Sequence, residues 1–261
     1  MSRPIALVTG ASSGIGEHLA RQLAERGHDL VLVARDQSRL EALAKEIESA
    51  GGASVQVLPA DLTDPEQLQR VEDRCHDKSA PIDVVVNNAG FGSFGAFHTL
   101  DVDGETREIQ LNVVALVRLT HAAASEMVPR GKGGILNVSS LAGFQPGPMN
   151  ATYGATKAFI TSFTEAVHEE LRGTGVSVTA LCPGFTRTGF QAAANVPQGD
   201  IPGFMWQGPA EVATVGLDAL AKNRAIAIPG PMNKVLGLFS SVTPHAITRR
   251  IGGAVIKRAT H

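Results

Sequence analysis

Short, continuously apolar runs rich in β-branched residues recur along the chain, and longer stretches with helical periodicity separate them. Seven such runs stand out: Ile5–Val8, Leu30–Val33, Val55–Leu58, Val84–Val86, Ile135–Val138, Val176–Leu181 and Ala225–Ile228. A strand that alternates apolar and polar residues has one wet face, whereas a continuously apolar strand is buried on both faces. The pattern therefore predicts an α/β fold with a doubly wound parallel sheet of about seven strands.

A single domain, residues 1–261, is expected. No internal repeat or low-complexity linker divides the 261 residues, and a chain of this length buries enough surface to fold without disulfides or a structural metal. We interpret Cys75 and Cys182 as reduced thiols and expect no metal site, because no cysteine or histidine cluster has metal-ligand spacing. Glycine, proline and asparagine interrupt residues 144–150 and about 185–208, which are predicted to be loops, the second of them a substrate loop.

The formal net charge of −2 hides an uneven distribution. Residues 219–261 contain seven basic groups and no acid, while the rest of the chain has 16 basic and 25 acidic residues. We interpret residues 231–261 as a basic tail that is solvated or covers an interface, with peripheral membrane contact as the alternative. No nucleic-acid binding is expected, because the charges are dispersed and lack interleaved aromatic residues. The chain shows neither a signal-peptide pattern nor a run of about 18 apolar residues, so a cytoplasmic protein without a membrane span is expected.

The first apolar run leads into the segment Thr9-Gly10-Ala11-Ser12-Ser13-Gly14-Ile15-Gly16, and an amphipathic helical pattern follows. The first glycine permits a tight turn, the second lets the backbone approach a pyrophosphate, and the third allows close helix packing. A helix N-terminus offers unpaired N–H groups and a positive dipole end to phosphate. We therefore predict a dinucleotide site of the Rossmann type, formed by Gly10, Ser12, Ser13, Gly14, Ile15 and Gly16.

The second run ends at Ala34-Arg35-Asp36, where such folds choose between a ribose hydroxyl and a 2′-phosphate. Arg35 and, one helical turn later, Arg39 offer guanidinium groups suited to a phosphate, so NADP is favoured. NAD is the less favoured alternative, because a strand ending one residue later would bring the Asp36 carboxylate to the hydroxyl.

Tyr153, the only tyrosine, precedes Lys157 by one helical turn, so the phenol and the ammonium share a helix face. A neighbouring ammonium can lower a phenol pKa from about 10 toward neutrality. Tyr153 is therefore a candidate general acid or base, although such a pair taken alone is more often a surface contact.

Taken together, these motifs resemble the short-chain dehydrogenase/reductase family in its single-domain Tyr-x-x-x-Lys form, over about residues 4–230. Four motifs occur in the family's order: the glycine motif, Asn87-Asn88-Ala89-Gly90, Asn137-Val138-Ser139-Ser140 and Tyr153-x-x-x-Lys157. Three further matches are Asp61, Asn112 and Pro183-Gly184.

The resemblance implies a catalytic role for four of these residues. Ser140, 13 residues before the tyrosine, would hydrogen-bond the substrate carbonyl, while Ser139 supports the strand end. Tyr153 would donate the proton, and Lys157 would lower the tyrosine pKa and hold the nicotinamide ribose. Asn112 would hold a water that continues the proton relay to Lys157.

The remaining cofactor contacts also follow from the resemblance. Asp61 would meet the adenine amino group, unless it only caps the loop ahead of Thr63. The other expected contacts are Asn88, Ala89, Gly90, Pro183, Gly184, and Thr186 or Thr188. For Thr188, ordinary turn bonding is the alternative.

Large apolar side chains gather in the loops beside the motifs: Phe91, Phe94, Phe97, Phe144, Phe185, Phe190, Phe204, Met205 and Trp206. They predict an apolar substrate pocket, or else a seal over the core. We interpret the chain as an NADP(H)-dependent oxidoreductase that interconverts a carbonyl and a secondary alcohol on an apolar small molecule. The alternatives are a nucleotide-binding sensor without turnover and a peripheral membrane protein whose basic tail is the functional part.

Apolar residues of the Tyr153 helix lie off its catalytic face, among them Phe159 and Phe163. Because members of the resembled family commonly pair this helix and the one at about residues 101–128 with a second subunit, we expect a homodimer or homotetramer. In the alternative, the tail folds back over these residues as a lid through Val235, Leu236, Leu238 and Phe239.

Overall fold

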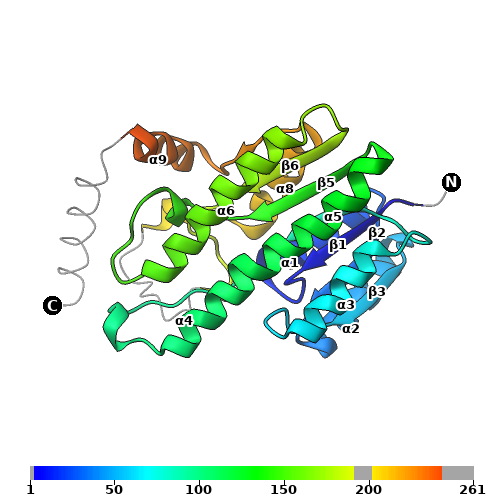
Figure 1. Cartoon of the computed structure of the whole chain (residues 1–261), viewed down its shortest axis with the longest axis horizontal. Helices are drawn as coiled ribbons and strands as arrows, with labels where there is room; N and C mark the ends of the chain where they lie inside the picture. The colour runs from blue at the N-terminus through cyan, green and yellow to red at the C-terminus, as the bar shows by residue number, and fades with distance from the viewer. Residues whose placement is uncertain (1–2, 191–201, 243–261) are drawn as a thin grey trace.

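The computed structural model describes residues 3–190 and 202–242, in which seven strands form one sheet with helices on both faces (Figure 1). The strand order is β3-β2-β1-β4-β5-β6-β7, and all neighbouring strands are parallel. The strands are β1 Ile5–Thr9, β2 Asp29–Ala34, β3 Val55–Pro59, β4 Ile82–Asn87, β5 Gly133–Val138, β6 Val176–Leu181 and β7 Ile226–Ala227. The predicted doubly wound sheet is confirmed, and each apolar run marks one strand.

Helices connect the strands: α1 Gly14–Glu25, α2 Gln37–Gly51, α3 Pro65–His76, α4 Val102–Ile109, α5 Leu116–Arg130, α6 Ala151–Glu170, α8 Pro209–Ala221 and α9 Pro231–Val242. Short 3-10 turns occur at η1 Phe97–Thr99, η3 Leu141–Phe144 and η4 Gly203–Met205. A π-helical turn, η2 Gln110–Ala115, joins α4 to α5. The single helix expected at about residues 101–128 is therefore divided into three segments.

The core consists of two apolar layers, one on each face of the sheet. Ala6 and Val8 of β1 pack with Leu23 of α1 in the layer under α1, α2 and α8. Leu7 packs with Leu119 of α5 in the layer under α3, α5 and α6, the helices on the near face in Figure 1. Successive strand residues point to opposite faces, so a strand covered on both sides must be apolar at every position. Both cysteines are buried and unpaired, as expected.

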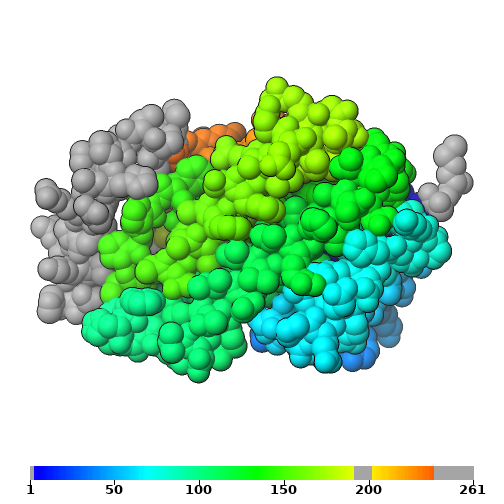
Figure 2. Space-filling view, viewed as in Figure 1, coloured from blue at the N-terminus to red at the C-terminus, as the bar shows by residue number. Residues whose placement is uncertain are grey.

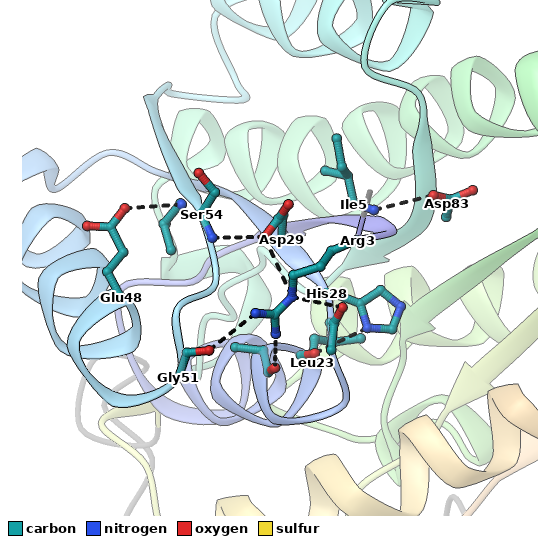
Figure 3. A network of polar contacts seen from close by, with 12 residues as sticks. Arg3, Ile5, Leu23, His28, Asp29, Glu48, Gly51, Ser54 and Asp83 are labelled. Carbon is teal, nitrogen blue, oxygen red and sulfur yellow. Dashed lines mark hydrogen bonds and ion pairs between the residues drawn. The ribbon is translucent and has the colours of Figure 1, made fainter. Parts of the chain in front are cut away.

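A polar network around Arg3 joins the amino ends of β1, β2 and β3 (Figure 3). The Arg3 guanidinium donates to the backbone oxygens of Gly27 and Ala24, each at 3.1 Å, and lies 3.8 Å from the Asp29 carboxylate. Asp29 in turn accepts a hydrogen bond from the Ser54 N–H at 2.8 Å. These contacts hold the amino ends of the three strands together. The longer loops lie at the opposite edge of the sheet, where the strands have their carboxyl ends.

Loops after β1, β4, β5 and β6 meet at this carboxyl edge, because parallel strands end on the same side of a sheet. Of the predicted substrate loop, residues 191–201 lie outside the described part. The predicted tail begins as α9, while residues 243–261 and the side chains of Leu238 and Phe239 are likewise outside it. Within residues 3–190 and 202–242, no helix has both the length and the apolar character needed to cross a bilayer.

Candidate active site

The glycine motif forms the turn from β1 into α1. Gly10 and Gly14 have φ of 64° and 59°, a backbone conformation that favours glycine. A Cβ on Gly16 would lie 2.2 Å from the Gly10 oxygen, so the close contact of loop and helix requires glycine there. Ser13, the N-cap of α1, makes no side-chain cap hydrogen bond, which leaves the first N–H groups of the helix for an anion. The loop therefore fits a dinucleotide diphosphate.

Thr9 and Asn88 fix the glycine loop to the end of β4. The Asn88 side-chain amide donates to the backbone oxygens of Thr9 at 3.0 Å and Gly10 at 3.2 Å. The Thr9 hydroxyl donates to the Val86 oxygen and accepts from the N–H groups of Asn88 and Ala89, each at 3.0 Å. Thr9 is a positioning residue that the sequence analysis missed, although its place directly before Gly10 was a signal.

Arg35 and Asp36 have different environments after β2. The strand ends at Ala34, and Arg35 is exposed, with no hydrogen bond or ion pair among the described residues. The Asp36 carboxylate caps α2: it accepts from the Ser38 hydroxyl at 2.7 Å and the Arg39 N–H at 3.1 Å, and the Arg39 guanidinium lies 3.4 Å away. The Ser38 hydrogen bond holds the pKa of Asp36 below its usual value. The carboxylate that kept NAD as an alternative is therefore engaged in the helix cap.

Asp61 follows β3 and forms a local turn. Its carboxylate accepts from the Thr63 N–H at 2.9 Å and the Thr63 hydroxyl at 2.7 Å, and its own N–H donates to Gln67 at 2.9 Å. The capping role that we considered as an alternative is present in the structure. The adenine contact stays a prediction.

Ser140 and Tyr153 come together at the carboxyl edge. Ser140 lies just beyond β5 and Tyr153 in the first turn of α6, and the two side chains are near enough for Ser140 to lower the pKa of Tyr153. Ser139 points elsewhere, because its buried hydroxyl bonds to the Lys157 backbone oxygen at 2.8 Å and the Thr161 hydroxyl at 2.7 Å. Of the two neighbouring serines, the spacing argument selected the one that contacts Tyr153.

The pKa of Tyr153 shifts in the direction opposite to our expectation. Burial raises it to about 12, and the charge of Glu108 adds to the rise, against the lowering effect of the nearby Ser140 hydroxyl. The Lys157 ammonium lies over the tyrosine ring, 5.5 Å from its centre, and donates to the Val138 oxygen at 2.9 Å, so it does not contact the phenol oxygen. Burial lowers the pKa of Lys157 itself to about 8.

Asn112 is buried in η2, beside Lys157. Its amide group donates to the Phe91 oxygen at 2.8 Å and the Thr156 hydroxyl at 3.1 Å, and its oxygen accepts from the Phe91 N–H at 3.2 Å. A Cβ on Gly90 would lie 2.9 Å from the Asn112 oxygen and 3.6 Å from the Lys157 nitrogen. Single π turns are frequent at functional sites. The water assigned to Asn112 by resemblance stays a prediction.

The two threonines after Pro183-Gly184 take different positions. Thr186 is buried, and its hydroxyl donates to the Gly184 oxygen at 3.1 Å. Thr188 lies opposite the glycine loop, since a Cβ on Gly14 would be 3.2 Å from its methyl carbon. Its hydroxyl also accepts a hydrogen bond from the Phe190 N–H at 3.3 Å, which is the turn bonding considered as the alternative role of Thr188. Of the two, Thr188 is the one placed beside the predicted cofactor site.

Part of the predicted aromatic group surrounds the site. Phe190 packs against Tyr153 with ring centres 5.3 Å apart, and Phe185 against Trp206 at 5.8 Å. The Arg187 guanidinium stands over the Trp206 ring at 5.7 Å. An open cleft of about 590 Å³ has a described lining of Arg187, Thr188, Gly189 and Trp206.

Other members of that group lie apart from the cleft or are turned outward. Phe97 and Phe204 are largely exposed.

Gly92, which the sequence analysis missed, lies against the Tyr153 ring: a Cβ on Gly92 would be 2.7 Å from a ring carbon of Tyr153. Across the described residues, no three histidine, cysteine or acidic side chains group closely enough to hold a metal ion.

The chain belongs to the short chain dehydrogenase family, whose model matches residues 4–198, and it is an oxidoreductase of that family. It is similar to the ketoacyl reductase HetN of Nostoc sp. strain PCC 7120, with 34% identity over 251 residues, 93% of this chain and 86% of the relative. A solved short-chain dehydrogenase from Sphingobium yanoikuyae, in complex with NADPH, has 36% identity and a TM-score of 0.82, covering 98% of this chain and 95% of that one. The bulky-bulky ketone specific alcohol dehydrogenase from Comamonas testosteroni has 31% identity and a TM-score of 0.78, covering 100% and 95%. The resemblance stated from the motifs is confirmed.

Proposed function

We propose that this protein is an NADP(H)-dependent oxidoreductase that interconverts a carbonyl and a secondary alcohol on apolar small molecules. The observation that carries the proposal is the assembly of Ser140, Tyr153 and Lys157 at the carboxyl edge of the sheet, beside the glycine loop. Ligands of open α/β sheets bind at this edge.

Each catalytic side chain has a distinct task in carbonyl reduction. Ser140 hydrogen-bonds the carbonyl oxygen, and Tyr153 gives its proton to that oxygen. With a pKa of about 12, the phenol stays protonated at neutral pH, which is the form that a general acid needs. Lys157 holds the ribose, and Asn112 holds a water near Lys157. The bound nicotinamide supplies the hydride.

The cofactor preference depends on the end of β2. The glycine loop and the N-terminus of α1 hold the diphosphate, while Arg35, which has no partner among the described residues, meets the 2′-phosphate. The Asp36 carboxylate already accepts two hydrogen bonds in the cap of α2, which favours Arg35 as the group that meets the ribose end of the cofactor. One of the similar solved structures is an NADPH complex. NADP is therefore preferred to NAD.

An apolar carbonyl compound is the proposed substrate. Trp206 lines the cleft and packs against Phe185, while Phe190 packs against Tyr153, and such rings bury apolar ligands. The similar proteins include one named for ketoacyl groups and one for bulky ketones, which supports the same class.

Turnover of NADPH with aromatic, steroid and aliphatic ketones tests the proposal. We expect consumption of NADPH with at least one apolar ketone. In Tyr153→Phe, kcat should fall by about 10² or more while NADPH affinity is kept, because only the transferred proton is deleted. NADPH binding without turnover of any ketone or alcohol would contradict the proposal and favour the sensor alternative.

A further inference from the structure

Glu108 is completely buried beside the catalytic residues, yet no role described above uses it. It lies in the last turn of α4, with 0% of its surface exposed. Neither carboxyl oxygen has a hydrogen-bond partner among the described residues, and no cation there lies within ion-pair distance. Burying a charged group without a partner is costly, so this carboxyl needs a proton or a bound water.

Glu108 belongs to a polar stripe on the buried side of α4 and η2. Glu105, one turn earlier, is buried and accepts a hydrogen bond from Thr152 of α6. Asn112, one turn later, is buried and donates to Thr156 of α6. A helix face packed inside a protein normally carries apolar residues. Here polar side chains lead from the outer part of α4 inward to the active site.

Charged and polar groups from three segments act on Glu108. Burial raises its pKa to about 7; Ser93, close by but outside hydrogen-bond geometry, lowers the pKa, the Glu105 charge raises it, and Lys157 lowers it. Glu108 in turn raises the pKa values of Lys157 and Tyr153. The pKa of Lys157 is about 8 and that of Glu108 is about 7. Because these two values are close, a proton transfer between Glu108 and Lys157 costs little free energy.

We propose, building on the proposed function, that Glu108 stores the proton that recharges Tyr153 and Lys157 during carbonyl reduction. Tyr153 loses its proton to the substrate oxygen and regains one from the Lys157 ammonium. The Glu108 carboxylic acid then protonates the Lys157 amine through an intervening water. The resulting carboxylate takes a proton from solvent on the side of Glu105. The sum is one solvent proton delivered to the carbonyl oxygen, and alcohol oxidation runs the same transfers in reverse.

Glu108 acts through Lys157 and touches neither substrate nor cofactor, so the pH profile is the decisive measurement. In the wild type, kcat for reduction should fall through an inflection near pH 7 as Glu108 ionises, and kcat for oxidation should rise through it. Glu108→Gln keeps the size of the side chain but holds no acidic proton. Both inflections should disappear, with kcat for reduction below pH 7 lower by about tenfold and KM unchanged. An inflection that persists in this variant overturns the proposal.

Glu105→Gln provides a matched variant one turn away on the same buried face. Removing its charge lowers the pKa of Glu108, so the inflection should move to lower pH and persist. An unmoved inflection overturns the proposal, and this holds even if Glu108→Gln does not fold.

Carbon-13 NMR of the glutamate carboxyl groups in the full chain reads the pKa of Glu108 without turnover. A titration near neutrality supports the proposal, whereas one near the model-peptide value of about 4.3 overturns it. A wild-type protein that turns over no carbonyl or alcohol would refute the proposed function and the relay with it. Failure of the relay alone would leave wild-type turnover intact.

Discussion

At the scale of single residues, the position at which β2 ends determines which side chain is placed to meet the ribose of the cofactor. Had the strand continued through Arg35, Asp36 would have been the first residue beyond it and a candidate for a ribose hydroxyl. Because β2 ends at Ala34, the exposed Asp36 caps the next helix, and Arg35 is exposed without a partner among the described residues. A strand boundary is the feature that sequence patterns locate least well, so the sequence favoured NADP through Arg35 but kept NAD as an alternative.

Arg35→Ala tests the cofactor preference. We expect wild-type protein to bind NADPH at least about tenfold more tightly than NADH, a difference of about 1.4 kcal/mol in binding free energy. Arg35→Ala should lose most of that preference through weaker NADPH binding, because the guanidinium contacts only the extra phosphate. Fluorescence titration with both cofactors measures this. Arg39→Ala is the control and should lose less, since Arg39 is paired with Asp36; equal wild-type affinities would show that the phosphate contact is absent.

The catalytic residues show what spacing predicts and what it does not. The 13-residue interval before Tyr153 selected Ser140, and in the structure these two side chains lie near each other. The expected fall in the tyrosine pKa did not follow from the shared helix face, because a pKa depends on burial and on where Lys157 finds its acceptor. Burial of polar side chains is set by tertiary packing, which no local motif encodes.

At the scale of elements, the Thr9 hydroxyl makes hydrogen bonds that connect the carboxyl ends of β1 and β4. Thr9 accepts from two partly buried N–H groups and donates to one carbonyl, so it connects the glycine loop with the Asn-Asn-Ala-Gly motif. The two motifs that the sequence analysis treated separately therefore form a single unit.

Thr9→Val keeps the shape of the side chain and removes the hydroxyl. The variant should lose about 1–3 kcal/mol in the free energy of unfolding, because two partly buried N–H groups are left without the Thr9 acceptor. Chemical denaturation measures the change. Thr9→Ser retains the hydroxyl and should keep most of the stability; equal losses in both variants would mean that packing of the methyl group, and not hydrogen bonding, is what matters at this position.

The segment from α4 to α5 shows where pattern reading fails for an element. A π turn adds one residue to a helical turn without removing the apolar periodicity around it, so the sequence indicates one helix. Glu105 and Glu108 of α4 are both buried, and the sequence analysis did not single out either residue. The strands, by contrast, could be located closely, since burial on both faces demands the continuous apolar runs that the chain displays.

At the scale of the whole molecule, α4, η2 and α6 leave an apolar surface open, which we call the outer patch. Figure 2 shows the surfaces of α5 and α6 uncovered by any described segment on this face. Phe159 is 44% exposed and stacks on Phe163 with ring centres 5.8 Å apart. Ile109 and Val114 are also exposed, and Ala155, Ala158 and Ala166 continue the patch along α6. Patches of this kind on enzymes commonly mark partner surfaces.

The described part of the tail leaves this patch open. In Figure 1, α9 lies at one end of the molecule, and its Gly237 packs against side chains of Ile228 and of Leu141 in η3. Val235, which the lid alternative placed over these apolar residues, is exposed. Within the described residues, α9 therefore does not cover the outer patch, and a second copy of the chain stays the expected partner.

We therefore predict a homodimer or homotetramer in which the outer patches of two subunits meet around a twofold axis. Light scattering at micromolar concentration should give a multiple of the 27.3 kDa chain mass, and a mass near 27.3 kDa would refute the prediction. Phe159→Glu should dissociate the assembly, because the twofold axis brings two buried charges into one apolar interface. Met232→Glu is the matched control: it places the same charge on an exposed apolar residue of α9, away from the patch, and should leave the mass unchanged. Dissociation by Met232→Glu and not by Phe159→Glu would move the interface to α9 and its tail.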